Sequence, residues 1–134
     1  MNKLLITLLF TCISFATIAQ NTADKTYKVA VAFNSFASGV PSSEPLKAFI
    51  KKFKKDNKIK KNIAADHIGP LGREGEYKLG FMLKELTKKQ QASFITKLKK
   101  VVDGMKDRGS AELIENDTIE MGNIARATIE VQKF

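Results

Sequence analysis

The sequence is poor in the residues that build metal sites and disulfides. It contains one cysteine, Cys12, one histidine, His67, and no tryptophan. One cysteine excludes a disulfide within the chain, and one histidine without a second thiol excludes a zinc site assembled from this chain alone. No stretch has the closely spaced acidic residues of a calcium-binding loop. We therefore expect neither a metal nor another cofactor.

Long apolar runs are also missing, apart from one at the N-terminus. Lys3 is followed by an uncharged and mainly apolar stretch, Leu4–Ala19, in which Thr17 and Ala19 are small. A short basic start, an apolar segment and small residues at its end are typical of a cleaved secretory signal. We predict a signal peptide at residues 1–19 and an exported protein that is periplasmic or secreted.

Two other interpretations of the N-terminus are weaker. An uncleaved anchor would need about 20 apolar residues to cross a bilayer, whereas this run is shorter and contains several hydroxyl groups. Lipid attachment at Cys12 would need small residues just before it, where Phe10 and Thr11 stand. We expect no transmembrane segment after cleavage and no lipid anchor on Cys12.

Removal of residues 1–19 leaves a strongly basic chain of about 115 residues. It takes away Cys12 and Lys3, so that 22 Lys and Arg remain against 14 Asp and Glu, a net charge of +8. A chain of this length can bury a substantial core as one domain. We predict a flexible mature N-terminus at 20–26 and a single α+β domain at 27–134.

Strands are predicted where apolar and polar residues alternate. Residues 27–33 and 77–84 show this pattern clearly, with Tyr27 on the same face as Val29. Residues 58–67 show it less clearly because Lys61 interrupts the apolar face. Each of these segments is expected to bury one side.

Helices are predicted where apolar residues recur every three or four positions. One begins at Ser42 or Ser43, and a second begins at Thr87, which fits a capping box with Gln90. Glycine at the end of such a segment favours termination. The predicted order is strand 27–33, helix from Ser42 or Ser43 to about Asn57, strand 58–67, strand 77–84, helix from Thr87 to a stop at Gly109, strand 111–115 and a possible strand 124–131 joined to it through Gly122 and Asn123.

This order is that of a ferredoxin-like βαββαβ sandwich. Such a domain is an antiparallel sheet with two helices on one face, and here it would have a possible extra C-terminal strand. The other face of the sheet is then expected to be open. It would display small and basic side chains, namely Lys28, Ala30, Ala32, Lys78, Gly80, Met82 and Lys84.

A glycine-rich connection is the first candidate binding site. Gly72 and Gly75 would let the backbone approach a ligand closely, and Arg73 between them could bind a carboxylate or phosphate with two hydrogen bonds. The segment is not a phosphate-binding P-loop, because no Gly-Lys-Ser/Thr follows and a strand comes next. The alternative is a long hairpin connection that uses glycine for turns.

His67 is a second candidate. It could act as a base beside a carboxylate, with Ser35 or Ser38 of the first loop as a nucleophile, as in a small hydrolase or transferase. No nucleophile-elbow motif surrounds either serine. As binding residues the two serines are secondary, because we expect the first loop and the glycine-rich connection to lie at different ends of the sheet.

Lysines form the strongest charge signal. One group lies opposite the apolar stripe of the first helix and forms a predicted anion-binding surface, and the second helix carries a further group. Such surfaces attract polyanions, although lysine also serves simply to solubilise a helix. Nucleic acid is not favoured, because no aromatic residues stand among the lysines to stack on bases. The first group comprises Lys47, Lys51, Lys54, Lys55 and Lys58.

Two segments carry a resemblance. The stretch 33–39, Phe-Asn-Ser-Phe-Ala-Ser-Gly, precedes a helix, and 72–77, Gly-Arg-Glu-Gly-Glu-Tyr, enters a strand. Together they resemble small secreted α+β proteins of Gram-negative bacteria that have no known activity. The resemblance implies export and a compact α+β domain, and it implies no catalytic residue.

The leading hypothesis from the sequence is an exported, non-catalytic binding module. Its partner would be an anionic surface, a polysaccharide or an acidic protein. The alternatives are the small hydrolase or transferase described above, and a domain that binds or inhibits another protein through a sheet edge or face. Fold alone does not decide among these classes.

Overall fold

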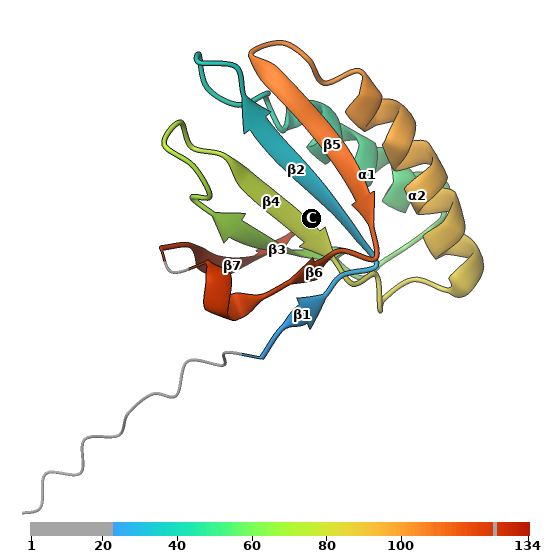
Figure 1. Cartoon of the computed structure of the whole chain (residues 1–134). Coiled ribbons are helices and arrows are strands. Elements are labelled where there is room, and N and C mark those ends of the chain that lie inside the picture. Colours follow the sequence, from blue (N-terminus) through green and yellow to red (C-terminus); the bar gives the residue numbers. More distant parts are fainter. Residues whose placement is uncertain (1–22, 125) are drawn as a thin grey trace, which may run out of the picture.

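The computed structural model describes residues 23–124 and 126–134, so the predicted signal peptide lies outside the described residues. Two helices lie side by side on one face of a five-stranded sheet (Figure 1). The strand order is β5-β2-β4-β3-β7, all neighbours are antiparallel, and β1 and β6 form a separate pair. The α+β prediction is confirmed. The elements are β1 (Lys25–Thr26), β2 (Val29–Ser35), α1 (Glu44–Asp56), β3 (Ala64–Gly69), β4 (Tyr77–Phe81), α2 (Lys88–Asp103), β5 (Gly109–Glu115), β6 (Thr118–Ile119), a 3₁₀ turn η1 (Met121–Asn123) and β7 (Thr128–Lys133).

The main core lies between the sheet and the two helices. Its centre is aromatic: the ring of Phe94 on α2 meets those of Phe49 and Phe53 on α1 and that of Phe81 on β4. Phe134, just after β7, also packs against Phe81, with ring centroids 6.2 Å apart. The helical and alternating apolar patterns therefore meet in one cluster, as the hydrophobic effect requires.

The capping predictions are confirmed at the start of α2 and wrong at its end. The Thr87 hydroxyl accepts the Gln90 N–H while the Gln90 side chain accepts the Thr87 N–H, which is a complete capping box. The helix ends at Gly104, and Gly109, predicted as its stop, opens β5 instead. The four residues between them form a connection whose Met105 carbonyl accepts the Ala111 N–H.

Strand boundaries differ from the predictions where the chain turns. β3 begins at Ala64 and not near Lys58, which follows α1 in a left-handed conformation (φ +52°). β4 ends at Phe81, since Leu83 also has a positive φ of 56° and leaves the strand direction. The possible C-terminal strand exists as β7, and it pairs with β3 at the far edge of the sheet, away from β5.

The face of the sheet opposite the helices is not open, which corrects the prediction. The chain bends after β1, so Tyr27 lies on this face and not beside Val29 in the main core. Its ring covers Gly80 of β4. A second apolar cluster forms here around Tyr27, Ile68 and Ile119. Of the side chains expected to be displayed, Ala30, Ala32 and Gly80 are buried, Lys78 and Met82 are half-buried, and Lys28 and Lys84 are exposed.

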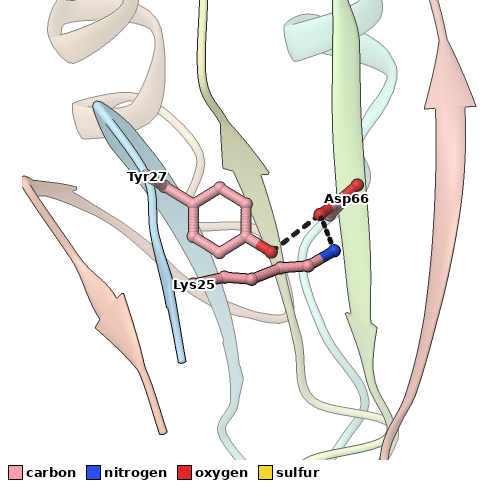
Figure 2. A network of polar contacts seen from close by, with 3 residues as sticks. All are labelled: Lys25, Tyr27 and Asp66. Atoms are coloured by element: carbon pink, nitrogen blue, oxygen red, sulfur yellow. Dashed lines mark hydrogen bonds and ion pairs between the residues drawn. The ribbon is translucent and has the colours of Figure 1, made fainter. Parts of the chain in front are cut away.

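Polar contacts fasten the N-terminal segment to this covered face. The Tyr27 hydroxyl donates to Asp66 Oδ2 at 2.8 Å, and Lys25 Nζ donates to the same oxygen at 3.1 Å (Figure 2). Nearby, Lys78 Nζ donates to Asp117 Oδ2 at 2.9 Å. Lys25 thus belongs to a paired strand, in a stretch that was expected to be a flexible N-terminus.

Candidate functional site

A pocket of about 590 Å³ opens on the helix face of the sheet, beside the start of α1. The side of the pocket that faces α1 is formed by residues of β3, β4 and the edge strand β7. A second hollow of about 290 Å³ adjoins it and shares Lys47 and Phe134 with it. We call the two together the α1–β7 groove. It is lined by Ser43, Leu46, Lys47, Lys51, Lys54, His67, Tyr77, Leu79, Gln132, Lys133 and Phe134.

Stacked rings form part of the floor of the groove. Tyr77 lies between Phe33, with centroids 4.3 Å apart, and His67, with centroids 4.6 Å apart. Both faces of the Tyr77 ring are therefore already covered. Burial raises the pKa of the Tyr77 phenol, and a hydrogen bond with Ser43 offsets part of that rise, so the phenol stays neutral at physiological pH. The floor offers neutral polar atoms and ring edges to a ligand.

Lysines of α1 form one wall. Lys47, Lys51 and Lys54 stand at i, i+4 and i+7, which places them on one helix face. Lys47 donates to Glu44 at 2.7 Å and both are exposed, so solvent weakens this ion pair. Lys51 is exposed and makes no ion pair among the described residues.

Lys54 is held more firmly than its neighbours. Its Nζ donates to the Phe134 carbonyl at 2.7 Å and to Asn62 Oδ1 at 3.0 Å. It therefore links α1 to the end of β7 and closes one end of the groove. Lys55 and Lys58 are exposed but line neither hollow, so the predicted five-lysine surface is divided in the structure.

No residue of the glycine-rich connection lines the groove; the connection lies beside the first loop, at the same end of the sheet. Ser35 Oγ donates to Glu74 Oε2 at 2.8 Å, which joins the two loops and corrects the expectation that they lie at different ends. Ser38 Oγ donates to the Arg108 carbonyl at 3.2 Å. Arg73, like Gly72 and Gly75 on either side of it, is exposed.

Space within this connection is used by its own side chains. A Cβ added to Gly72 would lie 2.1 Å from the Glu76 carboxylate, whereas one added to Gly75 would meet nothing within 4 Å. Gly75 has a φ of +83°, a turn conformation that favours glycine. Both glycines therefore have a local structural reason, consistent with the hairpin interpretation.

Ser35, Ser38 and His67 each contact other residues in the structure. Ser35 accepts the N–H groups of Ala37 and Gly39 while it donates to Glu74, so its hydroxyl is fully used in shaping the loop. In residues 23–124 and 126–134, no hydrogen bond joins His67 to either serine. Asp66, next to His67 in sequence, points to the opposite face of the sheet and binds Lys25 and Tyr27 (Figure 2).

Several groove residues were not identified from the sequence. The cap of α1 was expected at Ser42 or Ser43. It is the Ser42 hydroxyl that accepts the Glu44 N–H at 3.3 Å, and the Ser43 side chain makes no cap hydrogen bond. Tyr77 lies in a predicted strand but was not named as a site residue, and Gln132 lies just beyond the predicted end of the last strand, 124–131. No sequence signal indicated that β7 would pair with β3, and without that pairing the groove has only one wall.

Three further findings concern metal binding, membrane-spanning helices and similarity to known proteins. Within the described part of the chain, no group of three or more His, Cys, Asp or Glu side chains could hold a metal ion. No helix in the same part is both long enough and apolar enough to span a bilayer. No protein-family model matches the chain, and no curated protein or solved structure is significantly similar to it.

Proposed function

We propose that this chain is an exported, non-catalytic binding module that holds an anionic ligand in the α1–β7 groove. The observation that supports the proposal is the convergence of Lys47, Lys51 and Lys54 along one wall of a hollow that also exposes hydrogen-bonding groups. A hollow gives the positive charges a defined place to act, which a uniformly charged helix face would not.

The chemistry of the groove favours an acidic carbohydrate or a similarly hydroxylated anion. Lysine supplies charge without the fixed fork of arginine, so it suits ligands whose anionic groups are not held in one geometry. Ser43 and Gln132 can donate and accept hydrogen bonds with hydroxyl groups. Nucleic acid is disfavoured, since both faces of Tyr77 are covered and offer no platform for base stacking.

Export and the finer fold assignment belong to the same proposal. The signal peptide at 1–19 would place the mature chain, with its net charge of +8, among envelope or extracellular anions. The order β5-β2-β4-β3 agrees with that of a ferredoxin-like sandwich, with β7 as an added edge strand. Because β7 supplies Gln132, the added strand helps to form the groove.

A polyuronate such as alginate is a suitable probe, and its binding should be measured by calorimetry at several salt concentrations. The double variant Lys47→Gln/Lys51→Gln removes two charges from the groove, whereas Lys55→Gln/Lys58→Gln removes two charges outside it. We expect the groove variant to bind at least about tenfold more weakly. The slope of the logarithm of the binding constant against the logarithm of the salt concentration should also become shallower by roughly one for each lysine removed. The control variant should bind nearly as well as the unmodified protein.

Equal losses in the two double variants would show that net charge alone drives binding. Failure of the unmodified protein to bind the polyuronate even at low salt would reject the ligand class. Both double variants should fold like the unmodified protein, because all four lysines are exposed. Lys54, which links α1 to Phe134, is left in place.

A further inference from the structure

The outer edge of β7 carries a row of backbone groups with no partner in the described part of the chain. Ile63 and Phe134 exchange two hydrogen bonds, N–H to carbonyl in each direction, at 3.1 and 3.0 Å. They form a hydrogen-bonded pair that continues the register of β3 with β7. In an antiparallel ladder such pairs alternate with pairs whose backbone groups point away from each other.

This alternation fixes which residues of β7 face outward. Counting back from Phe134, the pairs containing Gln132, Glu130 and Thr128 bond to β3. The intervening residues Ile129, Val131 and Lys133 direct their N–H and carbonyl groups away from the sheet. Three residues therefore present six backbone hydrogen-bonding groups along one edge.

The other edge of the sheet is partly closed. Ala111 of β5 has its outward N–H bonded to the Met105 carbonyl at 3.1 Å, so the connection after α2 covers that edge. In residues 23–124 and 126–134 nothing covers the edge of β7 in this way. β7 also contains no proline and no bulge, two devices by which proteins protect exposed edges. Val131, in the middle of its outward row, is 63% exposed although apolar.

We propose that β7 pairs antiparallel with β7 of a second copy of this chain, with Val131 on the two-fold axis. In this register Val131 faces Val131 of the second copy, and Ile129 faces Lys133 on each side. All six outward groups of each copy are then used, giving six hydrogen bonds across the interface. Glu130 lies opposite Gln132, so no like charges face each other.

Neighbouring symmetric registers fit less well. Centring the pair on Glu130 brings two carboxylates face to face and leaves Lys133 outside the hydrogen-bonded row. Centring it on Gln132 places Val131 opposite Lys133, so the two exposed Val131 side chains no longer meet. The register centred on Val131 therefore combines the most hydrogen bonds with burial of the exposed apolar side chain.

Sedimentation velocity over a range of protein concentrations tests the association. The sample is the protein purified in the form that its host produces, after any processing of the N-terminus. We expect a dimer for the unmodified protein, and at least a tenfold increase in the dimer dissociation constant for Val131→Lys, which would place two ammonium groups opposite each other. Phe36→Lys is the matched control: Phe36 is 67% exposed and lies in the first loop. It should leave the dimer unchanged.

A cysteine series tests the register. In a chain carrying Cys12→Ser, Val131→Cys should give a disulfide-linked dimer, because directly opposed residues in a hydrogen-bonded pair have Cα atoms about 5.5 Å apart. Ile129→Cys should not crosslink to itself, since its partner is Lys133. A protein that stays monomeric up to millimolar concentration, equal weakening by Val131→Lys and Phe36→Lys, or equal crosslinking at 129 and 131 would each overturn the proposal.

Discussion

The ring of Tyr27 lies directly on the backbone of Gly80, so closely that a Cβ at position 80 would come within 2.6 Å of the ring. Both residues are on the face of the sheet that the helices leave uncovered, and Tyr27 is fully buried there. Because Gly80 has no side chain, the N-terminal segment can pack onto β4 at this position.

Gly80→Ala should destabilise the domain by about 1 to 3 kcal/mol, because the ring is buried and must shift to admit a methyl group. Urea unfolding followed by circular dichroism measures the change. Gly122→Ala is a suitable control, as a Cβ there would meet nothing within 4 Å. Equal stability of the two variants would show that Tyr27 can move freely.

Tyr27→Phe should change the alkaline limb of the stability profile. Burial raises the pKa of the Tyr27 phenol well above its usual range, and the hydrogen bond to Asp66 and the charges of Asp66 and Asp117 raise it further. Above pH 10 the unfolded chain releases this proton while the folded chain keeps it, so the free energy of unfolding falls as pH rises.

The unmodified protein should therefore lose stability faster than Tyr27→Phe above pH 10, by up to about 1.4 kcal/mol per pH unit. Lysine titration is common to both proteins and cancels in the difference. At neutral pH the variant should be less stable by about 1.5 kcal/mol, since the hydrogen bond to the Asp66 carboxylate is lost. Chemical denaturation between pH 7 and 11 measures both effects, and parallel profiles would contradict the assignment.

Ser35→Ala should loosen the first loop without unfolding the domain. The hydroxyl accepts the N–H groups of Ala37 and Gly39 and donates to Glu74, so its removal leaves three partners unsatisfied. Amide hydrogen exchange of Ala37 and Gly39 should accelerate by about tenfold. Ser38→Ala, which removes only the bond to the Arg108 carbonyl, should leave these two amides protected.

Thr87→Ala removes the capping box of α2 and should cost about 1 kcal/mol of stability. Thermal or urea unfolding gives the value. Thr96→Ala, at an exposed position inside the same helix, should be neutral or slightly stabilising because alanine is the better helix former. A similar loss in both variants would argue against a specific role of the cap.

Local features of this chain were predictable from sequence because each depends on neighbouring residues. The capping box of Thr87 with Gln90 needs only a four-residue spacing, and the end of α1 at Asn57 follows where the apolar stripe stops. The alternation also located strands at 29–33 and 77–81, although it predicted one exposed side and residues 29–33 are buried on both faces. These signals were sufficient for the α+β class.

Features that depend on distant pairing were not predictable. The side of the sheet on which Tyr27 packs is set by a bend after β1 and by its pairing with β6, about 90 residues later. The groove forms only when β7 pairs with β3, and no residue in either strand predicts which strand it will pair with. For the same reason the lysines of α1 were predicted as one surface, although only three of the five face β7.

The sequence by itself determined the composition-based limits, the two helices with their apolar stripes, and the excess of positive charge. Tertiary structure decided which lysines share a hollow, which face Tyr27 covers, and which edge of the sheet stays open. The physical reason is the range of the interactions involved. Periodicity and capping act within a few residues, whereas strand pairing and burial join segments whose separation along the chain leaves no trace in their local pattern.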